Sequence, residues 1–136
     1  MLIIDSNIWV YYFDRDAPEH RLVVNKVEKL LKSEKIVINT VIIIEVAHFL
    51  VKNLGPVAGN NKLEVFLSFP FTVANLDYYT VSKAVELLVR YSHQGIGGRD
   101  ATILATAQAF SLSKIVTHDD AFQRVDWLEV IDPISR

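Results

Sequence analysis

Four acidic residues occupy positions where an acid is unusual, because each lies beside or within an apolar segment of the chain. The four are Asp5, Glu45, Asp100 and Asp119. If the fold brings them together, their like charges repel, and a hard divalent cation such as Mg²⁺ is the usual remedy. Such a site supports hydrolysis, because metal-bound water loses a proton more easily than free water. The four acids are therefore candidate catalytic residues and candidate metal ligands.

Glu45 is the most informative of the four. It lies in the segment Val41–Val51, which is so apolar that we expect a helix buried on nearly all sides. A buried carboxylate needs compensation, and no lysine or arginine occurs between Lys35 and Lys52. A metal ion is one interpretation. A distant ion pair and a half-exposed helix face remain open alternatives.

The other three acids also have structural interpretations. Asp5 and Asp119 each follow an apolar strand candidate and each suits the N-cap of a helix or turn. Asp100 begins a helix of small residues, where a carboxylate interacts favourably with the helix dipole. We expect Asp5 and Asp100 to be the innermost ligands, and Glu45 and Asp119 to act directly or through water.

Strands that alternate with helices must position these residues. We predict a sheet of four to five strands, at Leu2–Ile4, Lys35–Asn39, Phe71–Ala74, Lys114–Thr117 and Leu128–Ile131. We predict helices at Glu19–Glu34, from a Thr40 cap to Leu54, from Pro56 to Phe69, after an Asp77 cap, and at Arg99–Ser111, with Gly95, Gly97 and Gly98 in a loop. This alternation indicates an α/β fold, a parallel sheet covered by helices on both faces. Such sheets bind ligands beyond the carboxyl ends of their strands, where Asp5 and Asp119 would lie.

Composition narrows the class of protein. The 136 residues suit one domain, 1–136, and hydrophobic residues make up 51%. The absence of cysteine excludes disulfides and thiolate metal sites, and four scattered histidines make a zinc site improbable. The start of the chain lacks the features of a signal peptide, and the most apolar stretch, Ile36–Val51, is shorter than the ~18 residues of a membrane span. We expect a soluble, cytoplasmic protein with no membrane segment.

Four segments together resemble the PIN-domain family, in order and over essentially the whole chain. They are DSNIWV at 5–10, NTVIIIE at 39–45, RDATILATA at 99–107 and VTHDDAF at 116–122. The resemblance implies a three-layer α/β/α sandwich and a ribonuclease dependent on Mg²⁺ or Mn²⁺. It places the family's acids on Asp5, Glu45, Asp100 and Asp119, with Asp119 preferred to Asp120 by the Thr-x-Asp register. Asn7 and Thr117 would be supporting polar residues.

The resemblance also implies partners. Small single-domain members are often toxins of the VapC type, paired with a small antitoxin that covers the site. The net charge of −2 offers RNA little attraction, so we expect a homodimer that pools its few basic side chains. The aromatic cluster at Trp9 and Tyr11–Phe13 is typical of an interface, although a generous core would also explain it. Arg99 is either a phosphate contact or a solvated surface residue, and His118 is the one histidine adjacent to the site.

Rival functions are less well supported. An aspartyl-phosphate phosphatase needs a second acid where this chain has Asn7, and a receiver domain needs an acidic pair after the first strand. Two alternatives remain open: a PIN-like scaffold that binds RNA or protein without catalysis, and an RNA-processing nuclease outside any toxin–antitoxin pair. Loss of one or more of the four acids would indicate the scaffold, and none is lost.

Overall fold

The sheet has five parallel strands in the order β3-β2-β1-β4-β5. The computed structural model describes residues 1–134. The strands are β1 (Leu2–Ile4), β2 (Ile36–Asn39), β3 (Phe71–Ala74), β4 (Lys114–Val116) and β5 (Glu129–Ile131). β1 lies between β2 and β4, and all of its residues are buried, as expected for a strand covered on both faces.

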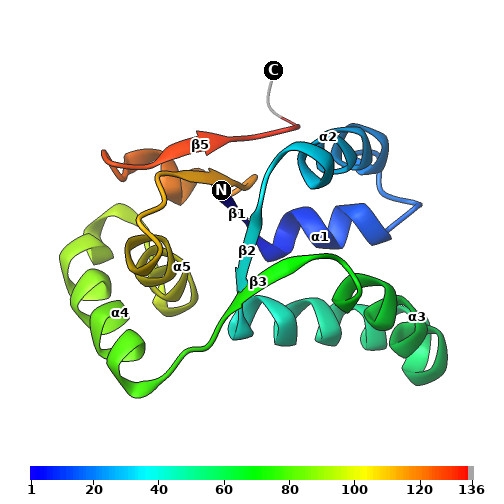
Figure 1. The fold of residues 1–136 in the computed structure, drawn as a ribbon, viewed down its shortest axis with the longest axis horizontal. Coiled ribbons are helices and arrows are strands. Elements are labelled where there is room, and N and C mark those ends of the chain that lie inside the picture. Colours follow the sequence, from blue (N-terminus) through cyan, green and yellow to red (C-terminus); the bar gives the residue numbers. More distant parts are fainter. Residues whose placement is uncertain (135–136) are drawn as a thin grey trace.

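Helices cover both faces of this sheet (Figure 1). α1 (Ser6–Phe13), α2 (His20–Ser33) and α3 (Thr40–Leu67) lie on one side, and α4 (Tyr78–Tyr91) and α5 (Gly98–Ala109) lie on the other. Two short 3₁₀ helices, η1 (Ser92–Gln94) and η2 (Asp120–Arg124), complete the secondary structure. The architecture confirms the predicted three-layer α/β/α sandwich around a parallel sheet.

α3 consists of the two helices that were predicted, and they follow one another without a loop. The backbone leaves the helical region at Gly55, whose φ is 83° and ψ is 169°. Only glycine adopts this backbone conformation without strain, and Pro56 then opens the second half. The predicted cap was wrong by one residue: Asn39 is the N-cap, and its Oδ1 accepts a hydrogen bond from the Ile42 N–H at 2.9 Å.

The expectation that Val41–Val51 is buried on nearly all sides was also wrong. One stripe of this segment, formed by Ile42, Val46 and Leu50, is fully buried. Ile44, in contrast, is 64% exposed. Hydrophobicity alone does not distinguish a buried face from an apolar face that remains at the surface.

α3 is also the one helix among the described residues with the length and composition to cross a membrane. Its most apolar 18-residue window has a mean hydropathy of 1.6, and 17% of that window is buried. This is weak evidence for a membrane span, since the backbone leaves the helix at Gly55 and Glu45 forms an ion pair with α5. Exposed apolar surface also occurs at protein interfaces.

Candidate active site

Asp5 stands at the carboxyl end of the central strand β1 and is fully buried. As the N-cap of α1, its Oδ1 accepts a hydrogen bond from the Ser6 N–H at 2.7 Å. Its Oδ2 accepts one from the Thr117 hydroxyl at 2.8 Å. Thr117 follows β4, the neighbouring strand, so two strand ends fix both oxygens of one carboxylate. The cap interpretation is therefore correct, and it does not compete with a role in a site.

Asn7 and Thr117 form a polar support behind Asp5. The Asn7 amide donates to Thr117 Oγ1 at 3.3 Å, and the Asp119 N–H donates to the same hydroxyl at 3.1 Å. The Asn7 Oδ1 accepts from the His118 N–H at 3.4 Å. The Thr117 hydroxyl thus links the ends of β1 and β4 to the loop that carries Asp119.

Asp100 and Asp119 are held by backbone N–H groups at two helix starts. Asp100 lies in the first turn of α5, where its Oδ2 accepts from the Gly97 N–H at 3.4 Å. Asp119 is the N-cap of η2, where its Oδ1 accepts from the Ala121 N–H at 3.0 Å. In each case one carboxylate oxygen is bound by the backbone and the other faces the centre of the cluster.

Arg99 occupies that centre. Its Nη1 donates to Asp5 Oδ1 at 2.7 Å and to Glu45 Oε1 at 3.4 Å. Its Nη2 donates to Asp100 Oδ1 at 2.6 Å and lies 3.8 Å from Asp119 Oδ2. All four predicted acids therefore converge on one guanidinium group, although they come from four separate segments of the chain.

The charges of this cluster perturb one another. Burial disfavours the charged form of Arg99, but the carboxylates of Asp5, Glu45 and Asp100 outweigh burial and raise its pKa. Burial also raises the pKa of Asp100; Arg99 and the Gly97 N–H oppose this shift, while Asp119 and Asp5 add to it. Burial is the largest of the effects on Asp100, and it disfavours the charged form of this acid within the cluster.

The four carboxylates are the right chemical type to bind a divalent cation, but their present spacing does not suit one. Carboxylate oxygens are the ligands that Mg²⁺ and Mn²⁺ prefer, and one oxygen from each acid faces the same point. Among the described residues, however, no group of three or more acidic or histidine side chains is spaced to hold a metal ion as it stands. Arg99 separates the four acids, so a metal would need that side chain to move.

The structure decides between the interpretations of Glu45 and corrects one expectation about Arg99. The Glu45 side chain is 34% exposed and pairs with Arg99, 54 positions away, so the alternatives of a half-exposed helix face and a distant ion pair are confirmed. Arg99 was expected at the site only as a phosphate contact or a solvated residue, and its position between the acids was missed. Its place directly before Asp100, at a helix start facing the strand ends, was the available signal.

Asp120 and His118 lie beside Asp119 in the sequence, but within residues 1–134 neither forms a hydrogen bond or an ion pair with Arg99. Asp120 is exposed, whereas Asp119, the acid preferred from the Thr-x-Asp register, is half-buried and approaches Arg99. His118 is 40% exposed, and its Nδ1 lies 2.8 Å from Asp132 Oδ2. Its ring lies 6.3 Å from that of Tyr11.

Comparison with known proteins finds one matching family and relatives that match over most of the chain. The PIN-domain profile matches residues 2–128. A ribonuclease VapC26 from Mycobacterium tuberculosis is 23% identical over 118 residues, 87% of this chain and 86% of the relative. A ribonuclease VapC2 from Methanocaldococcus jannaschii is 28% identical over 144 residues, 96% of this chain and 93% of the relative.

Solved structures show the same fold. The VapC20 toxin of Mycobacterium tuberculosis, described as cleaving the sarcin-ricin loop, superposes with a TM-score of 0.78 at 19% identity, covering 96% of this chain and 98% of that one. VapBC2 from Rickettsia felis, bound to a promoter DNA fragment, gives a TM-score of 0.76 at 23% identity, covering 96% and 97%. Because the profile match extends over nearly the whole chain, this protein belongs to the PIN-domain family.

Proposed function

We propose that this protein is a ribonuclease that depends on Mg²⁺ or Mn²⁺ and hydrolyses RNA phosphodiester bonds. The observation that carries the proposal is the convergence of Asp5, Glu45, Asp100 and Asp119 on one cationic position at the strand ends. Relatives named as ribonucleases, over most of their own length, support the same activity. All four acids are present, which favours an enzyme over a non-catalytic scaffold.

The position of each residue suggests its role in the proposed metal site. Asp5 and Asp100, the two most buried acids, would be the innermost ligands, with Glu45 and Asp119 at the more open side. A bound divalent cation would supply a water of lowered pKa and polarise the phosphate. Thr117 and Asn7 fix the orientation of Asp5, as the outer partners of a metal site do. The chain has no cysteine nucleophile, and none is needed for this hydrolysis.

An RNA cleavage assay tests the proposal directly. Purified protein is incubated with RNAs of mixed sequence in Mg²⁺, Mn²⁺, Ca²⁺ or excess chelator, beside an Asp5→Asn control that excludes contaminating nucleases. We expect cleavage in Mg²⁺ or Mn²⁺ and little in Ca²⁺, whose larger and looser coordination misplaces the attacking water. Full activity in chelator, or equal activity of the control, would overturn the proposal.

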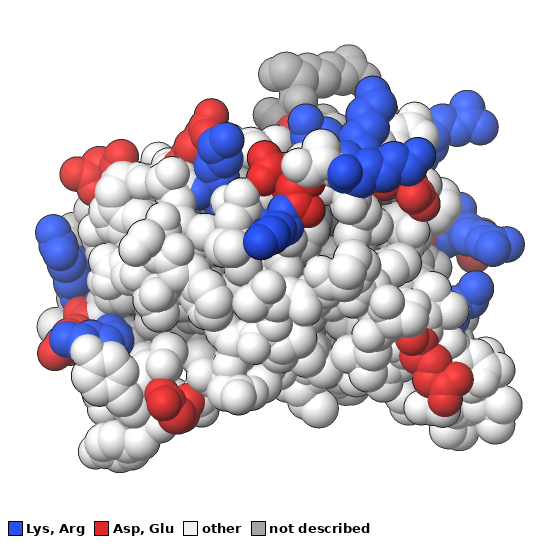
Figure 2. Space-filling model, in the orientation of Figure 1, with Lys and Arg blue, Asp and Glu red and all other residues white. Residues whose placement is uncertain are grey.

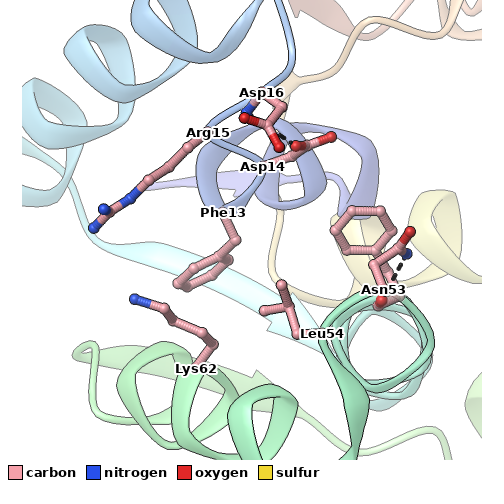
Figure 3. Close-up of a pocket in the computed structure, with 8 residues that line it drawn as sticks. Phe13, Asp14, Arg15, Asp16, Asn53, Leu54 and Lys62 are labelled. Carbon is pink, nitrogen blue, oxygen red and sulfur yellow. Dashed lines mark hydrogen bonds between the residues drawn. The ribbon is translucent and has the colours of Figure 1, made fainter.

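We further propose that a small antitoxin protein inhibits this nuclease. Structural neighbours described as toxin–antitoxin complexes, including one from Klebsiella pneumoniae (TM-score 0.76, 22% identity, 98% of each chain), support such a partner. A hollow of about 490 Å³ between the end of α1 and the bend of α3 suits a peptide segment. Figure 3 shows Phe13 and Leu54 facing it, with Arg15 and Lys62 beside them.

This hollow continues along α3 toward the acids. Phe49 and Asn53 line both it and a second hollow that reaches Glu45 and Lys52. An extended segment with apolar and acidic side chains would therefore lead from Lys62 to the candidate site.

Co-expression with a neighbouring small reading frame tests this partner. Leu54→Glu should abolish co-purification, whereas Leu22→Glu, at an exposed position of α2 outside this hollow, should not; equal co-purification by both variants would exclude the hollow.

A further inference from the structure

Arg99 uses the same carboxylate oxygens that a metal ion would need. It contacts one oxygen of each acid, at distances from 2.6 to 3.8 Å. In the three aspartates the opposite oxygen is bound by the protein, through Thr117 Oγ1, the Gly97 N–H and the Ala121 N–H. The inward oxygens are thus oriented by partners that do not depend on Arg99.

The charge balance of the cluster favours replacement of Arg99 by a divalent cation. Four carboxylates face one guanidinium, so three negative charges remain without a positive partner inside the cluster. A divalent ion carries twice the charge of Arg99 in a smaller volume, with ligand distances of about 2.0–2.1 Å for Mg²⁺. It would draw the acids closer than Arg99 does. Two cations sharing the same oxygens would repel each other, so the ion and Arg99 exclude one another from this position.

Arg99 has room to leave. Its side chain is 28% exposed, and it follows Gly97 and Gly98, where an added Cβ would meet nothing within 4 Å. The backbone that precedes Arg99 is therefore not enclosed by neighbouring atoms at these two glycines. A guanidinium that leaves the cluster remains tethered beside Asp100, where an RNA phosphate would approach. Its planar donors suit two phosphate oxygens at once.

We propose, on the basis of the proposed function, that Arg99 and the divalent cation are alternative occupants of the carboxylate cluster. In the metal-free protein Arg99 acts as an internal counter-ion that keeps the acids apart. Metal binding releases it, and the released guanidinium binds the RNA phosphate. Arg99 is then a substrate-binding residue that becomes available only when metal is bound.

The first test measures Mn²⁺ binding without RNA, by calorimetry and by the metal-dependent rise in melting temperature. Arg99→Ala and Arg99→Gln are compared with wild type and with Arg124→Ala, an exposed arginine that donates to the Gln94 carbonyl at 3.3 Å. If the cluster is free of Arg99 about a tenth of the time, removal of the guanidinium should tighten Mn²⁺ binding about tenfold. Arg124→Ala should bind like wild type. Unchanged or weaker binding by both Arg99 variants, or no Mn²⁺ binding by any protein, overturns the competition.

The second test measures the KM for RNA cleavage at saturating Mn²⁺. Arg99→Ala and Arg99→Gln should raise the KM for a mixed-sequence single-stranded RNA, and Arg99→Lys should restore part of the loss. An unchanged KM in all three would overturn the phosphate contact. The two proposals fail separately. If wild type binds Mn²⁺ yet cleaves no RNA, the nuclease proposal fails, while the calorimetric comparison still decides the competition.

Discussion

Thr117 shows how much of the site depends on a single hydroxyl group. The Oγ1 atom donates to Asp5 Oδ2 and accepts from Asn7 and from the Asp119 N–H. Because the residue is fully buried, water cannot replace any of these bonds. Asp5, Asn7 and Asp119 therefore share one partner at the end of β4.

Thr117→Val is expected to destabilise the protein by about 1–3 kcal/mol, because a shape-conserving change leaves buried polar groups unsatisfied. Thr117→Ser keeps the hydroxyl and should retain most of the stability and activity. Urea unfolding of the three proteins checks this. An equal free energy of unfolding for Thr117→Val and wild type would show that the hydroxyl is not a structural partner of Asp5.

The four acids should differ from ordinary structural residues in their effect on stability. Asp119→Asn and Glu45→Gln remove one of several like charges and weaken only the longer contacts with Arg99, at 3.8 and 3.4 Å. These two variants should melt at or above wild type without metal, while RNA cleavage falls by more than about a hundredfold, the upper end of the effect of outer partners in metal sites.

Asp5→Asn and Asp100→Asn should lose cleavage to a similar degree and remain folded. Thermal melts and the RNA assay test all four variants together. If every variant melts far below wild type, the acids stabilise the fold and their assignment as metal ligands fails.

At this scale the sequence identified the acids because each interrupts an apolar segment, and the structure brings them to one position. It did not identify the partner of Glu45. No lysine or arginine lies near Glu45 along the chain, and its partner Arg99 is 54 positions away. A long side chain can reach several acids, and residue spacing alone does not show which.

The helices illustrate how local chemistry fixes the larger structure. Asp77 was predicted as a cap, and its Oδ1 accepts from the Thr80 N–H at 2.8 Å at the start of α4. This hydrogen bond to the backbone lowers the pKa of Asp77 below its ordinary value of 3.8. A carboxyl whose pKa is lower in the folded state stabilises the protein above pH 3.8, and that contribution disappears as the pH falls through the lowered pKa.

Asp77→Ala should therefore melt below wild type at neutral pH, and the difference should shrink as the pH falls below 3.8. Asp77→Asn keeps a neutral cap and should show little of this pH dependence. Thermal melts between neutral and acidic pH measure it. A difference that is constant across the range would mean that the ionised carboxylate contributes nothing.

The bend in α3 brings its two halves into close contact. A Cβ added at Gly59 would lie 2.7 Å from the Leu50 carbonyl oxygen and 2.8 Å from the Val51 Cα, so backbone would have to shift. Gly59→Ala should cost about 1–3 kcal/mol of unfolding free energy. Gly98→Ala, in open space at the start of α5, should be neutral or slightly stabilising. Denaturant titration distinguishes the two, and equal effects would contradict the close approach.

Sequence patterns predicted the strands to within a residue or two, because buried parallel strands are short apolar runs between turns. They also predicted the break in α3 at Gly55, but they did not predict that α3 exposes Ile44 and Leu54. Helical periodicity requires a polar face to define the buried one, and Val41–Val51 has almost none. Which stripe faces the core is decided by the sheet and α1, which lie elsewhere in the chain.

On the scale of the whole molecule, charge and apolar surface are segregated. Figure 2 shows charged side chains along the edges of one face and an uncharged area over its centre and lower part, around α3 and α4. The large exposed apolar side chains of these elements are Ile44, Val51, Leu54, Val57, Val65, Leu67, Tyr78, Tyr79, Val81, Val85 and Val89. Exposed apolar surface of this extent is typical of a protein interface.

We predict a homodimer through the α4 part of this surface, because Leu54 of α3 lines the hollow proposed for the antitoxin. Light scattering should then give twice the 15.4 kDa of one chain. Val81→Glu combined with Val85→Glu places two charges on one side of α4 and should shift the mass toward that of the monomer. Lys83→Glu, on the same helix but already charged, serves as the control. A wild-type protein of 15.4 kDa at tens of micromolar would contradict the dimer.

The position of β4 has a consequence for the timing of protein synthesis. Asp5 is made almost at once, but its neighbouring strand β4, the Thr117 hydroxyl that fixes it and Asp119 are all made after residue 113. A nascent chain that has reached only α5 has an open sheet edge beside β1 and three of the four acids. The proposed nuclease therefore cannot assemble its site early in translation, and a truncated product that ends before β4 would be harmless to the RNA of the cell that makes it.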